Sequence, residues 1–337
     1  MKKNEKIDIV YLWVDDSDKN WRAQKDKWLE IIKGQKPVYE DAAIEARWRD
    51  NGEFLYSLRS VEKFAPWVNH IYIVTGFDQV PKWLNTDHPK ITIVPHSAIM
   101  PSDAIPTFNA TAIEMCIPNI PGLSERFLLM NDDMFFNRAL KPSFFFDKLG
   151  RARVLYSNHS HRSNNIKLWK SRVDEYNQTL ILSAEFIEHV FGKRVYKYRP
   201  SHGIDPYLKS SWLECRNHPQ ITDQIDAQTR NKFRTNTEVQ RWMFNLYDLI
   251  TGRAKFIHSR ARKHTRHKIT DFFYNLVFMP WIKNSPVYCT DTRSARRALL
   301  NAPTFCINDS RDTDDEILRA NAEFMAERFP EKSKFEK

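Results

Sequence analysis

Residues 127–136 read FLLMNDDMFF, an apolar stretch that encloses one asparagine and two adjacent carboxylates, Asp132 and Asp133. Burying a carboxylate is costly unless it is paired or bound to a metal ion. Residues 126–130 have the composition of a buried β-strand, which puts Asn131, Asp132 and Asp133 at its carboxyl end. Two interpretations stay open at this point: an acidic turn or cap between apolar runs, or a functional site.

The beginning of the chain has the same arrangement of an apolar strand followed by acidic residues. IDIVYLWV (residues 7–14) is rich in β-branched and aromatic residues, and DDSD (15–18) ends the strand. The other elements expected in this half are strands at 71–75 and 91–94 and helices at 20–32, 54–64 and 106–117. Strands that alternate with helices predict an α/β fold with a mostly parallel, Rossmann-like sheet flanked by helices. Ligands of such sheets bind beyond the carboxyl ends of the strands, which favours a site at both acidic segments.

After about residue 150 the pattern becomes more helical. Helices are expected at 179–191, 237–249, 291–300 and 313–329, and no linker rich in Gly, Ser or Pro separates the two halves. We therefore predict an α/β core over 1–150 and a mainly helical C-terminal elaboration over 151–337, within one integrated domain. Gly is scarce, at 8 of 337 residues, and neither a GxGxxG nor a Walker sequence occurs, so a dinucleotide-binding fold or a P-loop NTPase is poorly supported.

The chain carries 52 Lys and Arg against 42 Asp and Glu, a formal net charge of +10 that favours anionic partners. A basic patch at 258–268 is either a solvated face or a nucleic-acid contact, but no recognisable nucleic-acid module accompanies it, so nucleic acid is not an expected partner. The N-terminus lacks the pattern of a signal peptide, and the apolar stretch 272–282 is too short to span a bilayer. The protein is expected to be soluble, or at most peripheral, in a reducing cytoplasm. Its four cysteines form no CxxC pair and read as reduced thiols: Cys116, Cys215, Cys289 and Cys306.

Several polar residues could carry chemistry, and each also has a structural interpretation. Arg49, Asp50, Asn51 and Arg59 surround a helix start, where free N–H groups and arginines bind phosphate; a capped helix with surface ion pairs is the alternative. His202 would matter only if a substrate hydroxyl needs a base, and Arg234 would otherwise be structural. Asp309 follows an apolar strand, as Asp132 does, and either contributes to the same cation or caps the next helix.

The two adjacent aspartates suggest a magnesium site. Within an ideal strand, neighbouring side chains point to opposite faces, but at a strand end the backbone turns and both carboxylates can approach one cation. Mg²⁺ prefers one or two carboxylates together with substrate phosphates and water. The pair of Asp132 and Asp133 beside Asn131 suits Mg²⁺ or Mn²⁺, with Asp309 as a further candidate ligand, and an acidic cap on the following turn or helix remains the alternative.

Four regions of the chain, in this order, resemble the Stealth family of capsular polysaccharide phosphotransferases. The motifs that carry the resemblance are IDIVYLWVDDSD (7–18), RWRDNGEFLYSLRSVEKFAP (47–66) with PTFNATAIE (106–114) and SERFLLMNDDMFF (124–136), SHGIDPY (201–207) with TRNKFRTNTE (229–238), and CINDS (306–310). The family also includes the catalytic part of the animal GlcNAc-1-phosphotransferase. Asp16 stands where Gly or Asn-Gly is common.

The resemblance implies a GT-A-like fold and transfer of a sugar-1-phosphate from a nucleotide sugar, UDP-linked by family habit, to a glycan hydroxyl. The positions that match the family's activity motifs are Asp8, Asn131, Asp132, His202, Arg234 and Asp309. Mg²⁺ at Asp132 and Asp309 would neutralise the pyrophosphate, Arg49 and Arg234 would hold phosphate oxygens, and His202 would take the proton of the acceptor hydroxyl. Asp15, Asp50, Asn51, Arg59 and Asn109 are the remaining residues expected to bind the donor.

The alternative activity is that of a metal-dependent GT-A-type glycosyltransferase, which would release nucleoside diphosphate because only the sugar moves. The partners expected under either activity are a nucleotide-sugar donor and an anionic glycan acceptor. Capsule-assembly enzymes and the inner face of the membrane are further partners to consider, because the basic patch suits a polyanion or a membrane surface.

Overall fold

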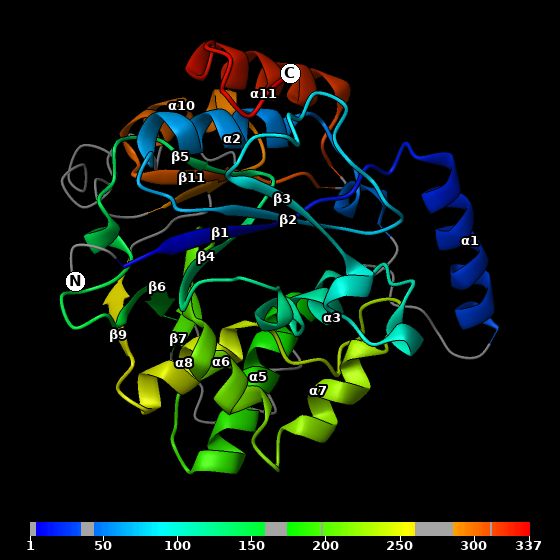
Figure 1. The fold of residues 1–337 in the computed structure, drawn as a ribbon, viewed down its shortest axis with the longest axis vertical. Helices are drawn as coiled ribbons and strands as arrows, with labels where there is room; N and C mark the ends of the chain where they lie inside the picture. Colours follow the sequence, from blue (N-terminus) through cyan, green and yellow to red (C-terminus); the bar gives the residue numbers. More distant parts are fainter. Residues whose placement is uncertain (1–4, 35–43, 159–173, 197, 260–285, 311) are drawn as a thin grey trace.

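The computed structural model of the chain describes residues 5–34, 44–158, 174–196, 198–259, 286–310 and 312–337 (Figure 1). The basic patch predicted to bind a polyanion falls outside these residues from position 260 on, as does the apolar stretch 272–282.

A five-stranded sheet forms the centre of the molecule, in the order β3-β2-β1-β4-β8. The first four strands are parallel, and β8 pairs with β4 in the antiparallel sense. The order 3-2-1-4 is that of a doubly wound sheet, so the prediction of a mostly parallel, Rossmann-like α/β fold is confirmed. The strands are β1 (Ile7–Leu12), β2 (Ile71–Thr75), β3 (Ile91–Pro95), β4 (Arg126–Asn131) and β8 (Asp205–Leu208).

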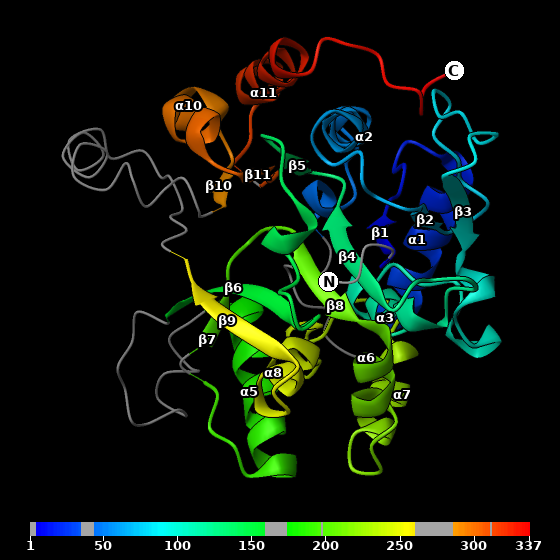
Figure 2. The same cartoon turned by 60° about the vertical axis from the view of Figure 1, so that its left-hand side comes forward.

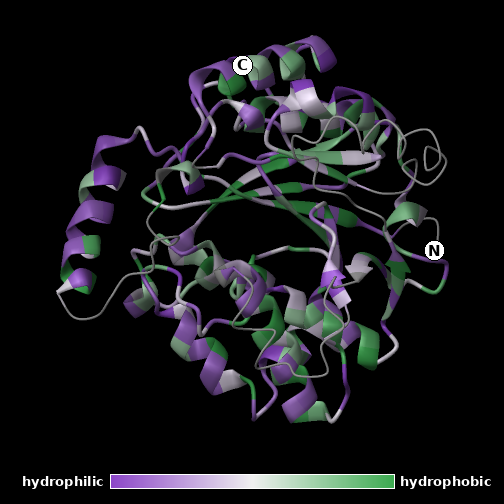
Figure 3. Ribbon diagram, turned by 180° about the vertical axis from the view of Figure 1, so that it is seen from behind, coloured by the Kyte–Doolittle hydropathy of each residue, from purple (hydrophilic) through white to green (hydrophobic). Residues whose placement is uncertain are grey.

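Helices cover both faces of the central sheet (Figure 1). On one face lie α2 (Glu53–Phe64), α10 (Thr292–Asn301) and α11 (Asp315–Arg328). The helices on the other face are α3 (Ala110–Glu114), α5 (Glu175–Phe191), α6 (Lys209–Arg216), α7 (Thr222–Thr229) and α8 (Trp242–Ile250). Because both faces are covered, the strands read as continuous apolar runs, and Figure 3 shows them as mostly hydrophobic ribbons.

Helix α1 (Lys19–Lys33) lies at the side of the molecule, and its ribbon is mostly hydrophilic (Figure 3). Asp18 caps its first turn by accepting a hydrogen bond from the backbone N–H of Trp21 at 2.8 Å. Trp21 is its buried residue and packs edge-on against Trp48, with 5.8 Å between ring centroids. The helix is therefore held to the body of the protein by Trp21 and the cap, and partly buried residues further along it pack against the same aromatic cluster: Trp28, Leu29 and Ile32.

Two smaller sheets extend the fold, and the sequence analysis missed most of their strands. One has the order β10-β11-β5, with β10 (Val287–Cys289) parallel to β11 (Thr304–Ile307) and β11 antiparallel to β5 (Met134–Phe136). It lies beside α2 and α10 (Figure 2). The other has the order β7-β6-β9 and consists of β7 (Tyr198–Pro200), β6 (Ala152–Asn158) and β9 (Ala254–His258).

The second half of the chain is thus less purely helical than expected, because short strands complete the sheets of the first half. Strand β8 extends the central sheet beside β4, and β11 pairs with β5. The segment 106–117, which was predicted to hold a helix, contains α3; the side chain of Asn109 accepts from the N–H of Thr111 and so starts the helix there. One hydrophobic core contains residues from both halves; Phe127 of β4, for example, stacks on Tyr207 of β8 at 5.7 Å between centroids.

Candidate active site at the ends of strands β1 and β4

The acidic pair occupies a turn between two sheets. Asn131 ends β4, Asp132 and Asp133 form the turn, and Met134 begins β5 in the neighbouring sheet. The apolar residues on either side are buried because they belong to these two strands. The backbone therefore turns where the sequence predicted. Neither carboxylate lies within a strand, so the two are not forced to opposite faces of the sheet.

Burial and like charge oppose ionisation of both aspartates. Burial, followed by the charges of Asp133, Glu53 and Asp50, raises the pKa of Asp132 well above its usual range. Burial also raises the pKa of Asp133 to about 6, although the Cys306 thiol, which donates to its Oδ2 atom at 3.1 Å, acts in the opposite direction. A cluster of carboxylates that suppress one another's ionisation is the donor set that a divalent cation stabilises, so these residues fit the predicted metal.

The last predicted acidic residue, Asp309, is brought to the same region by strand pairing. Cys306 of β11 lies opposite Met134 of β5, and the backbone N–H of Ile307 donates to the carbonyl oxygen of Asp133 at 3.0 Å. Asp309 comes two residues after β11 ends and accepts from the backbone N–H of Ser310 through Oδ1. Residues more than 170 positions apart in the sequence thus arrive at one place through antiparallel pairing.

The polar cluster before helix α2 also meets Asp309. The Oδ2 atom of Asp309 lies 3.3 Å from Arg49 Nη1 and 3.3 Å from Asn51 Nδ2. The same Asn51 nitrogen donates to Glu53 Oε1 at 3.0 Å. Burial is the main cause that raises the pKa of Glu53 to about 7, and the charge of Asp133 contributes. Arg49, Asn51 and Asp309 are therefore joined in one polar cluster.

Asp15 and Asp50 lie beside this cluster, at the carboxyl end of β1. Asp50 accepts from Trp13 Nε1 at 3.0 Å and from the backbone N–H of Gly52 at 2.8 Å. Burial, and to a smaller degree the charges of Asp15 and Asp16, raises the pKa of Asp50. Gly52 has φ of +84°, a left-handed conformation that allows the chain to turn sharply into α2. Asp15 itself accepts from the N–H of Ser17 at 2.9 Å.

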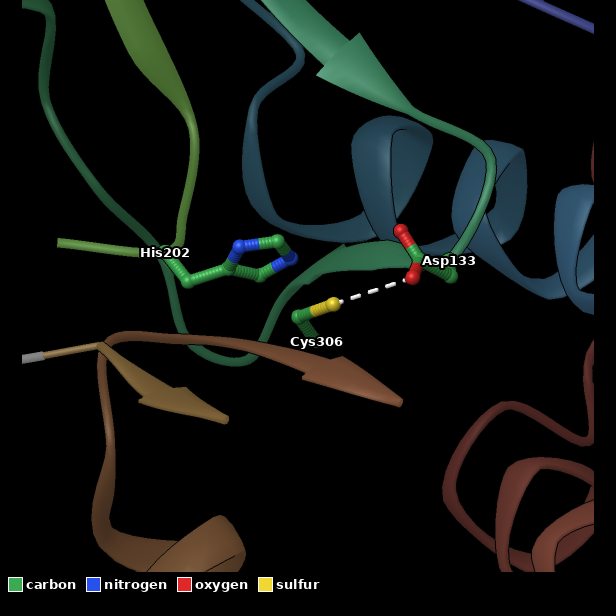
Figure 4. Close-up of side chains that lie close together, drawn as sticks. All are labelled: Asp133, His202 and Cys306. Atoms are coloured by element: carbon green, nitrogen blue, oxygen red, sulfur yellow. Dashed lines mark hydrogen bonds between the residues drawn. The ribbon is translucent and has the colours of Figure 1, made fainter. Parts of the chain in front are cut away.

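His202 reaches the acidic turn from the segment between β7 and β8. One ligand atom from each of Asp133, His202 and Cys306 lies within 4.8 Å of the others (Figure 4). Burial, followed by the charges of Arg241 and Arg199, lowers the pKa of His202 to about 4. The imidazole is consequently neutral at neutral pH, because its burial and the two nearby arginines oppose protonation. Its ring packs edge-on against Tyr288, with 4.7 Å between centroids.

Arg241 is a central residue of the site that the sequence analysis missed. Its guanidinium is largely shielded from solvent and pairs with Glu114, with Asp205 at 3.4 Å and with the Oδ1 atom of Asn131 at 3.5 Å. Its charge acts on both Asp133 and His202. The sequence contained a signal for Arg241, because it directly precedes the apolar run WMFNLY (242–247). A charge next to such a run is costly to bury unless it is paired, as was argued for Asp132.

Arg234 and Asn109 belong to a second polar cluster, around Glu238. Asn109 is buried, caps α3 and donates from Nδ2 to Glu238 Oε1 at 2.9 Å. Burial raises the pKa of Glu238 to about 7, and the charge of Arg234 acts against this increase. The oxygen and the nitrogen of the Asn109 amide are thus both hydrogen-bonded within the fold, and its expected role in binding the donor stays a prediction.

Asp8 and Arg59 each make several hydrogen bonds to other parts of the fold, away from the acidic turn. Asp8 accepts from Asn69 Nδ2 and from the Ser124 N–H, each at 2.7 Å, and is fully buried. It lies four residues before the end of β1, about 13 Å from the acidic end of the sheet. Arg59 binds both oxygens of Glu336 at 2.7 and 2.9 Å, so it ties α2 to the C-terminal segment. The catalytic role expected of Asp8 and the phosphate-binding role expected of Arg59 stay predictions.

Among the helices of the residues that the structure describes, none combines the length and apolar character needed to cross a bilayer. This leaves the expected peripheral association with a membrane as a prediction.

Comparison with known proteins places this geometry in a family. Residues 5–33 match the model of Stealth protein conserved region 1, and residues 47–154 match that of Stealth protein conserved region 2. The second match contains the acidic turn and the Arg49–Glu53 cluster. These are the first two of the regions on which the resemblance was based.

Curated relatives extend the match over the whole chain. An exopolysaccharide phosphotransferase, cps2G of Lactiplantibacillus plantarum, is 31% identical over 98% of this chain and 96% of its own length. The capsular polysaccharide phosphotransferase WcwK of Streptococcus pneumoniae is 30% identical over 98% and 99%. A capsular polysaccharide phosphotransferase of Neisseria meningitidis serogroup B is 34% identical over 72% of this chain and 63% of its own.

Among solved structures, the galactosyltransferase LgtC in complex with donor and acceptor sugar analogs aligns over 96% of this chain and 95% of its own. The sequence identity is 14% and the TM-score is 0.46, a similarity too weak to support an argument about function. The sequence comparisons are decisive, and by them the chain belongs to the Stealth protein family.

Proposed function

We propose that this chain is a phosphotransferase that moves a sugar-1-phosphate from a nucleotide sugar to a hydroxyl of a glycan. The observation that carries the proposal is the meeting of Asp133 and His202 at the carboxyl end of β4, beside the Arg49–Asn51–Asp309 cluster. The relatives over the full length of the chain are named exopolysaccharide and capsular polysaccharide phosphotransferases, which supports the same reaction class.

The acidic residues fit a divalent cation, Mg²⁺ or Mn²⁺, held by Asp132, Asp133 and Asp309 with the amide oxygen of Asn131. When bound, such a cation supplies Lewis acidity and neutralises the charge of a donor diphosphate. The crowding that raises the pKa of Asp132 supports this assignment, because the like charges of Asp133, Glu53 and Asp50 act on one buried carboxyl group.

The chain's own residues then position the donor and the acceptor. Arg49 is half exposed and pairs with Asp309 at 3.3 Å, so its remaining N–H groups are available to hold phosphate oxygens. Arg234 would serve the same purpose from the loop before Glu238. His202, beside Asp133 at the acidic turn, accepts the proton of the acceptor hydroxyl as the new O–P bond forms. The bond from phosphorus to the nucleotide breaks, and nucleoside monophosphate leaves with the electron pair.

The arrangement of the chain supports a single integrated catalytic domain, because Arg49 and Asn51 of the first half need Asp309 and His202 of the second. The net charge of +10 supports an anionic glycan as the acceptor. A UDP-linked hexose or N-acetylhexosamine such as UDP-GlcNAc is the proposed donor. These substrates are consistent with an enzyme that acts in the cytoplasm, at the inner face of the membrane and beside other capsule-assembly enzymes.

The released nucleotide tests this proposal against the glycosyltransferase alternative. Purified protein with Mg²⁺, a panel of nucleotide sugars and a glycan acceptor should release nucleoside monophosphate, identified by mass spectrometry. Asp132→Ala should abolish release, whereas Asp26→Ala on the exposed face of α1 should retain it. Release of nucleoside diphosphate would establish transfer of the sugar alone and overturn the proposal.

A further inference from the structure

Asp133, His202 and Cys306 form a compact group of three different ligand types. They come from the turn after β4, the segment before β8 and strand β11, and their ligand atoms lie within 4.8 Å of one another. The thiol of Cys306 donates to Asp133 Oδ2 at 3.1 Å, and Figure 4 shows the imidazole with a nitrogen turned toward these two side chains. The three side chains therefore surround one point.

Two polar atoms of this group are left without partners by the rest of the fold. Within the part of the chain that the structure describes, Asp133 Oδ1 and His202 Nε2 are buried and have no hydrogen-bond partner. Buried polar atoms without a partner are rare because each costs roughly 1–3 kcal/mol. A ligand that accepts electron pairs from both an oxygen and a nitrogen would satisfy them together.

The chemistry of the three groups selects the kind of ligand. Mg²⁺ binds oxygen almost exclusively, so a site with a thiol and an imidazole does not suit it. Thiolate, imidazole and carboxylate are the usual ligands of Zn²⁺, and three protein ligands leave a fourth tetrahedral position open. Bonds of about 2.0–2.3 Å place tetrahedral ligands about 3.3–3.8 Å apart, so these side chains need to close by roughly 1 Å.

We propose that Asp133, His202 and Cys306 form a binding site for a thiophilic divalent cation of the zinc class, and that its occupation inhibits transfer. Its ligand set differs from that of the magnesium site by Cys306 and His202, and the two sites share Asp133. Binding replaces the thiol proton of Cys306 by the metal, and that proton is released to solvent. Inhibition follows because the nitrogen of His202 is then coordinated to the metal and cannot accept a proton. The inhibition rests on the proposed function, whereas the metal binding does not.

The binding is tested with Co²⁺ in place of Zn²⁺, because a cobalt–thiolate bond gives an absorption band in the near ultraviolet. Titration of the whole protein should produce this band with one Co²⁺ per chain, and added Zn²⁺ should remove it. Cys306→Ser should abolish the band and weaken Zn²⁺ binding by roughly 100-fold. The matched control is Cys289→Ser on the adjacent strand β10, which is buried like Cys306 and should leave the band unchanged.

A measurement on the unaltered protein covers the case in which Cys306→Ser does not fold. X-ray absorption of the Zn²⁺-loaded chain should show one sulfur neighbour together with nitrogen or oxygen neighbours. A shell with nitrogen and oxygen alone, or a band that survives Cys306→Ser but not Cys289→Ser, would overturn the site.

Inhibition is tested separately by adding Zn²⁺ to the assay in the presence of excess Mg²⁺. Zn²⁺ should reduce nucleotide release, a chelator should restore it, and Cys306→Ser should need at least about 10-fold more Zn²⁺ relative to its own uninhibited rate. Equal sensitivity of both proteins would refute the inhibitory role. A chain that binds Co²⁺ through Cys306 but releases no nucleotide would refute the proposed function and leave the metal site standing.

Discussion

The side-chain nitrogen of Asn51 lies 3.3 Å from the Oδ2 atom of Asp309, although 258 positions separate the two residues. Arg49 reaches the same oxygen at 3.3 Å, and Asn51 also donates to Glu53 at 3.0 Å. The start of α2 and the segment after β11 are therefore one polar unit beside the acidic turn. A substitution on either side of this unit should affect the other.

The charge of Asp309 should be essential for transfer. We expect Asp309→Asn to reduce kcat by about 100-fold or more, because the amide carries no charge to neutralise a cation and keeps one acceptor oxygen in place of the two that face Ser310 and Arg49. The measurement is nucleotide release at saturating donor. Asp315→Asn, at an exposed position of α11, is the control, and a kcat within threefold of the parent for Asp309→Asn would exclude the charge from the reaction.

His202 should act in the chemical step and not in binding of the donor. Replacement by Gln keeps much of its size but removes the basic nitrogen, so kcat should fall by about 100-fold while KM for the donor changes little. Steady-state kinetics over a range of donor concentrations separate these two parameters. An increase in KM alone would identify His202 as a donor-binding group.

Arg241 should hold the acidic residues in position and stabilise the fold. Arg241→Ala leaves Glu114 and Asp205 buried without their cation, which should cost about 3–5 kcal/mol of unfolding free energy. Arg241→Lys keeps the charge but loses the fork that contacts Asn131, so it should recover much of the stability and little of kcat. Denaturant unfolding and the transfer assay measure the two effects.

The exposed pair of Arg230 and Asp103 provides the control for Arg241. Arg230→Lys should change neither stability nor kcat measurably, since exposed pairs contribute little. Recovery of full activity by Arg241→Lys would argue that the charge alone suffices and that the contact with Asn131 has no positioning role.

Arg59 should contribute to stability and not to phosphate binding, contrary to the sequence-based expectation. Arg59→Ala removes the paired bonds to Glu336 and the bond to the Phe329 carbonyl, which should lower the unfolding free energy by roughly 1–3 kcal/mol. At a temperature where the variant is folded, KM for the donor should match that of the parent protein. A large rise in KM with unchanged stability would restore Arg59 to the donor site.

Asp248 should make the protein less stable as the pH rises. Burial raises the pKa of this carboxyl to about 7 in the folded chain, against about 3.9 when unfolded. Because the folded chain binds this proton more tightly than the unfolded chain does, the protonated carboxyl group of Asp248 stabilises the fold. This contribution is complete below pH 4 and is lost as the pH rises toward 7. The corresponding free energy is on the order of 2–4 kcal/mol.

Asp248→Asn tests this effect because the amide cannot ionise. The unfolding free energy of the variant minus that of the parent protein should increase between pH 4 and 7, as measured by urea titrations at each pH. Ser211 donates to the Asp248 carboxylate and can donate equally to the amide oxygen. A constant difference across this range would mean that Asp248 remains ionised in the folded chain; Asp26→Asn on the surface should give a constant difference.

The sequence by itself determined the parallel strands and their acidic ends. Runs such as IDIVYLWV and FLLMN form strands wherever both faces are covered, and Asp, Asn and Gly end them through local hydrogen bonds and backbone freedom. Four of the predicted strands and the helix before Pro66 match the structure to within two residues. These features are local, so composition and spacing suffice to predict them. The polar cluster at the helix start pointed to Arg49 and Asn51, and the family motifs pointed to His202 and Asp309; the fold brings these residues to one region.

Only the tertiary structure decided which of these residues share a site. Asp8 and Asp132 both flank apolar residues, but one lies at the start of its strand and the other after the end, so the parallel register separates them. Arg59 meets Glu336, and Arg241 meets Glu114, through contacts across more than 120 positions. Such pairs form only when strands and helices that are distant in the sequence pack together, which requires the chain to close long loops. Which elements pack together is determined by the free energy of the whole core and not by any one segment.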